Sequence, residues 1–153
     1  MRPGSSIEVR LEEGDRRPFV PLLLEGDEDE AMLARYLDEG SLLAAYVDGE
    51  LSGVALVVGQ ELMNIAVAAK HRREGLGSLL LAAAEDLVSK EWNAIIVGTG
   101  DHSPARAFYE ANGYEEYGCR EGFFDRYARP VVEGGHILHD MVMYRKSLST
   151  SGR

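Results

Sequence analysis

The sequence predicts a domain of the α/β class, of the α+β type, in which helices flank a mixed and mostly antiparallel central sheet. Two observations carry this prediction. Three strand-like segments follow one another between residues 41 and 67, and strands joined by tight turns pair antiparallel. Residues 60–97 then read as strand, helix and strand, the unit that places two strands parallel. In all, we expect about six to seven strands and about four helices, packed in layers around one core.

The N-terminal part predicts one strand followed by short helices. Residues 7–11 (IEVRL) alternate apolar and charged side chains, as a half-buried strand does. Residues 14–24 have apolar side chains at helical spacing, but Pro18 and Pro21 restrict them to helix starts or bends. The acidic run 27–30 precedes the segment AMLARYLDEG, and carboxylates in a first turn are stabilised by the helix dipole. The same run allows a second interpretation, an acidic rim that attracts a cationic substrate.

The centre of the chain predicts a hairpin and a third strand. Residues 41–47 (SLLAAYV) and 51–58 (LSGVALVV) are strand-like and flank the turn pair Asp48-Gly49. Residues 60–67 (QELMNIAV) read as the next strand.

The C-terminal half predicts two helices that alternate with strands. A helix begins near Leu76, because apolar side chains recur at positions i, i+3, i+4 and i+7. Residues 94–97 (AIIV) are typical of a strand that is buried on both faces. Ser103-Pro104 begins the second helix and Gly113 ends it. We further expect strands at 114–120 and 137–145, a loop at 121–136 and a flexible polar tail at 146–153.

Composition limits the class of protein. The chain has 153 residues, which suits one domain spanning residues 1–153 with its own apolar core. A formal charge of -10 argues against nucleic acid as a partner, because nucleic-acid binding needs a basic face. Cys119 is the only cysteine, so we expect no disulfide framework and no metal site. The sequence shows no signal peptide and no apolar run of about 20 residues, so we expect a cytoplasmic protein without a membrane partner.

The stretch KHRREGLG at residues 70–77 predicts an anion-binding loop. It follows a strand and opens a helix, and the first amides of a helix point outward without an internal partner. Glycines let the backbone approach a bulky phosphate, and Arg72 and Arg73 add fixed positive charge. The loop matches neither the P-loop pattern nor the dinucleotide pattern G-x-G-x-x-G. What remains is Arg72-x-x-Gly75-x-Gly77, which suits a pyrophosphate.

In three segments the chain resembles the GNAT superfamily of N-acetyltransferases. The pyrophosphate loop of that family reads Arg or Gln-x-x-Gly-x-Gly or Ala, and residues 72–77 match it. Residues 64–67 (NIAV) resemble the strand that precedes the loop. Residues 105–114 (ARAFYEANGY) resemble a later helix of the family, A-x-x-x-Y-E-x-x-G-F or Y. The order of elements agrees over nearly the whole chain, so the resemblance implies a GNAT-like fold.

A smaller bacterial subgroup, whose substrate is unassigned, is similar in further positions. Residues 123–127 (FFDRY), Pro130, the EGG at 133–135 and the DM at 140–141 resemble its pattern F-F-x-x-x-Y…P…E-x-G…D-M. The T-G pair at residues 99–100 is also similar. One departure follows it, because the family often has an asparagine there that contacts the cofactor, whereas this chain has Asp101-His102.

The resemblance implies acetyl-CoA as the co-substrate. The pantetheine arm would pair with the backbone of a strand that splays from its neighbour, and the pyrophosphate would sit on the loop amides and basic side chains. Tyr109 matches the family tyrosine that protonates the leaving sulfur, and a phenol is protonated at neutral pH. The implied cofactor-binding residues are Ile65, Ala66, Val67, Arg72, Arg73, Glu74, Gly75, Leu76, Gly77, Ser78 and His102.

The attacking amine must be neutral, so a base or a water chain would help. Some family members carry a catalytic carboxylate at the offset of Glu61, which makes Glu61 the candidate base. His136 and His139 are weaker candidates. We expect an N-acetyltransferase that acts on a primary amine of a small molecule or protein, and a homodimer is possible. The alternative is a non-catalytic acyl-CoA-binding module that has kept the loop and lost turnover.

Overall fold

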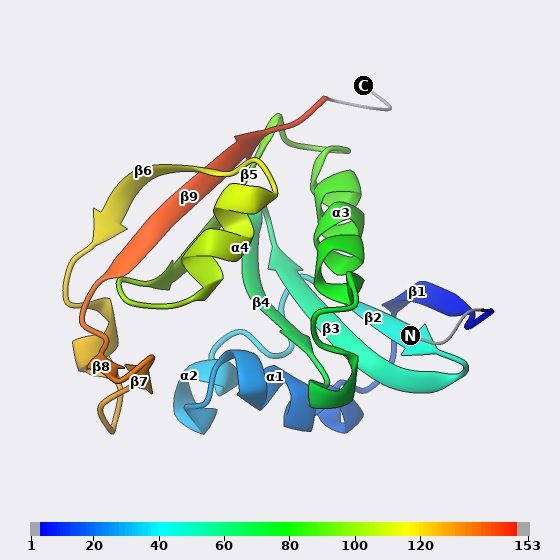
Figure 1. Ribbon diagram of the computed structural model, residues 1–153, viewed down its shortest axis with the longest axis horizontal. Coiled ribbons are helices and arrows are strands. Elements are labelled where there is room, and N and C mark those ends of the chain that lie inside the picture. The colour runs from blue at the N-terminus through cyan, green and yellow to red at the C-terminus, as the bar shows by residue number, and fades with distance from the viewer. Residues whose placement is uncertain (1–3, 150–153) are drawn as a thin grey trace.

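The computed structural model describes residues 4–149, and their centre is a seven-stranded sheet (Figure 1). The strand order is β1-β2-β3-β4-β5-β9-β6. Every pairing in this sheet is antiparallel except that of β4 with β5, which is parallel. The predicted mixed and mostly antiparallel sheet is therefore confirmed. The strands are β1 (Ile7–Glu12), β2 (Ser41–Val47), β3 (Glu50–Val58), β4 (Glu61–Val67), β5 (Ala94–Gly100), β6 (Glu115–Arg120) and β9 (Met141–Ser147).

Helices cover both faces of the sheet (Figure 1). One face packs against α3 (Leu76–Val88) and α4 (Ala105–Ala111), and the other packs against α1 (Val20–Gly26) and α2 (Glu30–Ala34). The strands are apolar on both faces for this reason, as a doubly covered sheet requires. In β2, for example, Leu43 faces the α3 side and Leu42 the α1 side, and both are buried.

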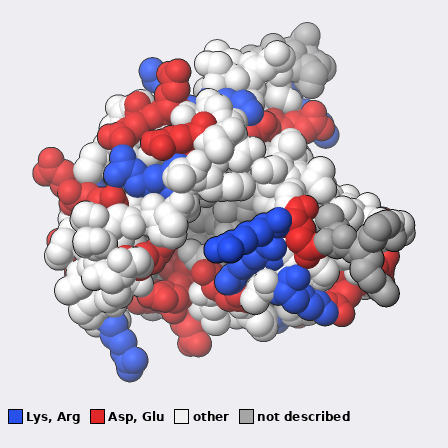
Figure 2. Space-filling model, in the orientation of Figure 1, with Lys and Arg blue, Asp and Glu red and all other residues white. Residues whose placement is uncertain are grey.

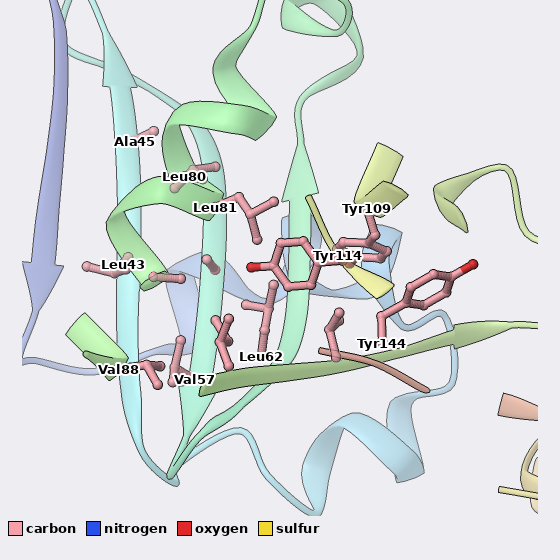
Figure 3. Packing of buried hydrophobic residues seen from close by; sticks show 14 of the residues in the cluster. Leu43, Ala45, Val57, Leu62, Leu80, Leu81, Val88, Tyr109, Tyr114 and Tyr144 are labelled. Atoms are coloured by element: carbon pink, nitrogen blue, oxygen red, sulfur yellow. The ribbon is translucent and has the colours of Figure 1, made fainter. Parts of the chain in front are cut away.

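The larger apolar cluster lies beneath α3 and ends in three tyrosines (Figure 3). Leu80 and Leu81 on α3 are 0% and 1% exposed. Tyr109, Tyr114 and Tyr144 continue the same cluster toward α4. The cluster therefore joins the packing of α3 to the position of the α4 tyrosine.

Strands β4 and β5 separate soon after they pair. Their parallel ladder consists of Glu61 with Ile96 and Leu62 with Val97. A bulge places the next residue of β4, Met63, outside the register with β3, and a bulge bends a strand and increases its twist. The two strands consequently open a gap between them along the rest of β4.

Three short 3-10 helices and a small hairpin complete the described chain. The predicted loop at 121–136 is more ordered than expected, because a 3-10 helix and a two-stranded hairpin form within and just after it. No helix within residues 4–149 is both long and apolar enough to span a bilayer. These elements are η1 (Arg17–Phe19), η2 (Ala69–His71), η3 (Phe123–Arg126), β7 (Val132–Glu133) and β8 (His136–Ile137).

The last strand extends past the point where a flexible tail was expected. It begins at Met141 rather than at residue 137 and continues to Ser147. The Lys146 ammonium lies 3.1 Å from a carboxylate oxygen of Glu85, and the Leu148 N–H donates to a backbone carbonyl at 2.8 Å. Of the tail predicted at 146–153, residues 146–148 thus lie against the fold, and 150–153 lie outside the described residues.

Candidate active site

A cleft of about 670 Å³ opens where β4 and β5 separate. Figure 2 shows this hollow with Lys and Arg side chains over the η2–α3 segment on one rim and acidic side chains over α1 and α2 below it. Side chains from both faces of the sheet line the cleft. Phe108 and Tyr109 come from α4, whereas Asp27 and Tyr36 come from the α1–α2 side. The cleft therefore brings together side chains from the two faces of the sheet.

The basic rim is the tight loop at residues 72–75. Arg73 and Gly75 have left-handed backbone conformations, with φ of 62° and 84°. The helix begins at Leu76, and the amides of its first turn have no partner within the helix. The Leu76 side chain is buried in the core, so only its backbone is open to a ligand, while Ser78 is exposed. The loop has the backbone that an anion site needs.

Two further loop residues shape the mouth of the cleft. A Cβ atom on Gly77 would lie 3.4 Å from Phe108 and 3.8 Å from Val67. Any longer side chain at this position would project into the mouth. Glu74 lies beside His71, with 3.3 Å between its carboxylate oxygen and the ring Nδ1.

The two arginines of the loop differ in their surroundings. Arg72 donates from Nε to the carbonyl of Val67 at 3.1 Å, and its Nη2 lies 2.7 Å from a carboxylate oxygen of Glu25. It thereby ties α1 to the end of β4. The Arg73 side chain is exposed and has no hydrogen bond or ion pair within residues 4–149. Arg73 is thus the guanidinium that an incoming anion meets without competition.

The splayed part of β4 forms one wall of the cleft. Ile65, Ala66 and Val67 all line it, and the ladder with β5 has ended before them. An open strand edge of this kind can pair with the backbone amides of an extended ligand. The three residues predicted from the resemblance therefore lie along a usable edge.

Tyr109 lies at the floor of the cleft and is 4% exposed. Its ring is packed among Phe108, Tyr114 and Tyr144, with centroid distances of 5.3, 5.7 and 6.2 Å. Burial raises the pKa of the Tyr109 phenol, so the group stays protonated at neutral pH. The hydroxyl has no hydrogen-bond partner among the described residues, which leaves its proton available to a ligand in the cleft.

Glu61 also lines the cleft, but its carboxylate is already engaged. Arg120, at the end of β6, contacts both oxygens, at 3.1 and 3.3 Å. The Glu61 side chain is 19% exposed and that of Arg120 43%. The predicted base is therefore one half of an ion pair.

Comparison with known proteins identifies the family. The family model of the GNAT acetyltransferase domain matches residues 38–116, which include the splayed strand, the loop and α4. The chain belongs to the GNAT acetyltransferase family. A curated relative, the uncharacterized N-acetyltransferase YvbK of Bacillus subtilis (strain 168), is 28% identical over 144 residues, which cover 89% of this chain and 93% of the relative.

Solved structures agree with this acetyltransferase over nearly its whole length. An IAA acetyltransferase from Bacillus cereus is 27% identical with a TM-score of 0.86, and the match covers 94% of this chain and 100% of that one. A GNAT acetyltransferase from Elizabethkingia anophelis with bound acetyl-CoA is 29% identical with a TM-score of 0.84, covering 93% and 98%. A Bacillus subtilis acetyltransferase in complex with CoA is 27% identical with a TM-score of 0.84, covering 94% and 99%.

These findings confirm an acetyl-CoA-dependent N-acetyltransferase with acetyl-CoA as co-substrate. The cleft fits this co-substrate on its own features. The glycine at position 77 keeps the mouth clear, and β4 offers an unpaired edge beyond Leu62.

On the face opposite α4, the acetyltransferase has a polar cluster that the sequence did not single out. The Tyr36 hydroxyl donates to Oδ2 of Asp27 at 3.0 Å and accepts from Nδ2 of Asn64 at 3.1 Å. Tyr127 lies near the Asp27 carboxylate and interacts with it electrostatically. All four side chains line the cleft.

The turn after β5 departs from the prediction for His102. The exposed His102 ring stacks on that of His136, with centroids 4.3 Å apart, and does not line the cleft. Ser103 lines it instead; this residue is 6% exposed, and its hydroxyl donates to Glu133 at 2.8 Å. A cofactor contact of His102 stays a prediction, since its ring lies outside the cleft lining.

The remaining histidine candidates lie at the surface. His139 is paired with Asp125, with 2.8 Å between ring nitrogen and carboxylate oxygen, and the carboxylate raises the pKa of the imidazole. Neither His136 nor His139 lines the cleft. Within residues 4–149 no group of three or more His, Cys, Asp or Glu side chains is placed to hold a metal ion.

Proposed function

We propose that this acetyltransferase transfers the acetyl group of acetyl-CoA to a primary amine, of a small molecule or a protein, by direct attack of the amine on the thioester carbonyl. We further propose that residues 1–153 form one acetyltransferase domain. The observation that carries the reaction is the cleft between β4 and β5, because side chains from both faces of the sheet line it. Two substrates could meet there without leaving solvent between them.

The basic loop and the open strand edge support the binding of acetyl-CoA. The amides at residues 73–78 and the free guanidinium of Arg73 would hold the pyrophosphate. The backbone of Ile65, Ala66 and Val67 would pair with the pantetheine arm. Arg72 would act mainly by holding α1 against the end of β4.

Tyr109 is the proposed proton donor to the sulfur. Its phenol is protonated, buried and unengaged at the cleft floor. Such a donor favours departure of the thiol, because general acid catalysis lowers the barrier for a poor leaving group. The tyrosine contacts on three sides keep the ring in place without using the hydroxyl.

The base role of Glu61 stays a prediction. Glu61 is within the cleft, which supports the role, but Arg120 occupies both of its oxygens. A carboxylate in a bidentate ion pair must weaken that pair before it accepts a proton.

Ligand binding is tested first, by thermal unfolding with acetyl-CoA, CoA, NADH or ATP. A ligand at 100 times its dissociation constant stabilises the fold by about 2.7 kcal/mol, which raises the melting temperature by several degrees. We expect acetyl-CoA and CoA to stabilise the wild type and to leave Gly77→Glu unchanged, because the new carboxylate fills the mouth of the cleft. Equal stabilisation by all four ligands would contradict a CoA site.

Turnover is then tested by release of the thiol in the presence of a panel of primary amines. Acetylation of any of them, confirmed by the mass of the product, would support the proposed reaction. Binding of acetyl-CoA without turnover on any amine or protein extract would favour the acyl-CoA-binding module instead.

A further inference from the structure

Asp27 is a carboxylate with one buried oxygen that accepts no hydrogen bond. Its Oδ1 is fully shielded from solvent and has no partner among the described residues. Its Oδ2 accepts from the Tyr36 hydroxyl at 3.0 Å. An anionic oxygen in this condition is costly unless a donor reaches it. The side chain lines the cleft, so a ligand bound there can supply the missing donor once the carboxylate turns toward it.

The fold holds this carboxylate close to the strand that lines the co-substrate side. Asp27 directly follows α1, whose last residue, Gly26, touches Asn64 of β4: a Cβ there would lie 2.0 Å from the Asn64 side-chain oxygen. Asn64 donates to Tyr36 at 3.1 Å, and Tyr36 donates to Asp27. Asn64 is 5% exposed, and its own Oδ1 also lacks a partner among the described residues. Two buried acceptors thus stand on the same wall of the cleft.

The charges around the cleft favour a cation. Both arginines that line it are already paired, Arg72 with Glu25 and Arg120 with Glu61. The carboxylate of Asp27 has no cationic partner among the described residues. A protonated primary amine has a positive charge and several N–H donors. It can therefore supply both the cation and the hydrogen-bond donor that Asp27 lacks.

We infer that Asp27 receives the acceptor amine as an ammonium ion and removes its proton before the attack, with Tyr36 positioning the carboxylate. This assignment rests on the proposed acetyl transfer to a primary amine. It also selects the class of acceptor, an amine that carries its positive charge into the cleft and has no carboxylate group.

The proton balance of the transfer is complete with these groups. The ammonium gives one proton to Asp27, which later returns it to solvent. The nitrogen lone pair forms the bond to the carbonyl carbon, and the carbon–sulfur bond breaks. The sulfur takes a proton from the Tyr109 hydroxyl. The nitrogen then loses its second proton, which restores the Tyr109 hydroxyl. The products are the amide, the free thiol and one released proton.

Burial raises the pKa of Asp27, although the hydrogen bond from Tyr36 and weaker interactions with the Asp29 backbone and Tyr127 act in the opposite direction. A higher pKa makes Asp27 a stronger base than an ordinary aspartate. Glu61 is held by Arg120, so it is the weaker candidate of the two. The other charged or titratable groups around Asp27 are Asp29 and Glu28 on its own segment, Glu25 and Arg72 at the α1 rim, Arg126 beside Tyr127, and the Glu61–Arg120 pair.

The deciding experiment compares Asp27→Asn with Glu30→Gln. Glu30 belongs to the same acidic run but is exposed and does not line the cleft, so its replacement changes the charge alone. At pH 7 we expect kcat to fall about 100-fold in Asp27→Asn and to stay within about twofold in Glu30→Gln. The stabilisation by CoA should be the same in both variants.

The pH profile separates a base from a structural residue. Without the base, turnover depends on amine that is already neutral, so kcat/KM of Asp27→Asn should rise about tenfold per pH unit below the amine pKa of about 10.4. The wild-type profile should level off at lower pH. Parallel profiles for wild type and variant would overturn the assignment. A second variant, Asp27→Ala, should regain turnover when formate is added, and absence of rescue together with parallel profiles would confirm that Asp27 is structural.

The acceptor class is tested with butylamine, putrescine and γ-aminobutyrate, which share a four-carbon chain. We expect both cationic amines to be acetylated at least about tenfold faster than the amino acid, as like-charge repulsion disfavours a carboxylate in this cleft. Preference for γ-aminobutyrate would overturn the class. Failure of the wild type on every amine, with CoA binding intact, would overturn the proposed function itself, whereas turnover that is insensitive to Asp27→Asn would overturn only this assignment.

Discussion

Arg120 holds Glu61 by both carboxylate oxygens, with nitrogen–oxygen distances of 3.1 and 3.3 Å. The pair joins β6 to β4, although β5 and β9 lie between these strands in the sheet. It therefore spans the cleft close to the point where β4 and β5 stop pairing. A residue that the sequence suggested as a base thus has a second possible role, which is to hold the two halves of the sheet together.

The ion pair predicts a mild effect for Glu61→Gln. We expect kcat to fall less than about tenfold, and the free energy of unfolding to fall by about 1 kcal/mol or less, because the pair is partly exposed. Steady-state kinetics and denaturant unfolding check both. Arg120→Ala should resemble Glu61→Gln in stability. A fall in kcat of about 100-fold in Glu61→Gln alone would restore Glu61 as the base.

Replacing Tyr109 should separate turnover from binding. In Tyr109→Phe we expect kcat to fall about 100-fold, while the dissociation constant for CoA and the melting temperature change little, because the hydroxyl has no protein partner within residues 4–149. Calorimetry and initial rates measure these quantities.

Tyr114→Phe is the matched control for that variant. The Tyr114 hydroxyl donates to Glu85 at 2.8 Å, so its loss should cost about 1 kcal/mol of stability and leave turnover intact. If Tyr109→Phe keeps full turnover, the assigned proton donor is wrong.

The sequence predicted the helices and strands well, because the spacing of apolar residues indicates which face of each element is buried. The strand predicted at residues 41–47 has these bounds in the structure. The predicted helix begins at Leu76, where its apolar pattern begins. The glycine loop could be found for the same kind of reason, since a left-handed turn before a helix needs a residue such as Gly75.

The acceptor side could not be predicted in this way. Asp27 lies in an acidic run whose local explanation, the start of a helix, holds for Asp29, which caps α2 by accepting from Met32 at 3.0 Å. Nothing local distinguishes Asp27, because its buried position depends on Tyr36, nine residues later, and on Tyr127 in a distant segment. The stacking of His102 on His136 could not be predicted for a related reason, because it is a tertiary contact. An acidic rim for a cationic substrate was one interpretation of the run, and two of its residues, Asp27 and Glu28, line the cleft.

Gly75 offers a test of the loop backbone with a close internal control. Its φ is 84°, and a Cβ there would meet no atom within 4 Å. Gly49, in the β2–β3 turn, has φ of 82° and equally open surroundings. Alanine at either position should therefore cost about 1–2 kcal/mol through the same left-handed strain.

Only Gly75→Ala should also weaken CoA binding, because only this residue orients amides at the cleft mouth. We expect a loss in affinity of about tenfold, measured by calorimetry, with no change for Gly49→Ala. Equal affinities in the two variants would mean that the loop backbone does not hold the pyrophosphate.

The two loop arginines should have separable effects. Arg73→Ala removes a guanidinium that has no protein partner among the described residues, so the affinity for CoA should fall about tenfold while stability stays constant. Arg72→Ala removes the links to Val67 and Glu25, so stability should fall by up to about 1 kcal/mol. Titration of CoA at two salt concentrations and thermal unfolding measure these effects; if Arg73→Ala binds CoA as the wild type does, the loop amides alone hold the anion.

Asp27→Asn should stabilise the protein at neutral pH while it impairs turnover. Burial raises the pKa of Asp27 in the folded state, so between the unfolded pKa of about 3.9 and the folded value the native protein binds more protons than the unfolded chain. Stability consequently falls as the pH rises through this window and stays lower above it. The introduced amide carries no charge and can still accept from the Tyr36 hydroxyl, so it removes that penalty.

We therefore expect the melting temperature of Asp27→Asn to exceed that of the wild type at pH 7, by about 2–4 °C for each kcal/mol gained. The advantage should vanish below about pH 4, where the wild-type carboxyl is protonated in both states. Glu30→Gln should show no such gain, because that carboxylate is exposed. A lower melting temperature of Asp27→Asn at pH 7 would show that the charge is already compensated within the protein, and the carboxylate would then have no need of an ammonium ligand.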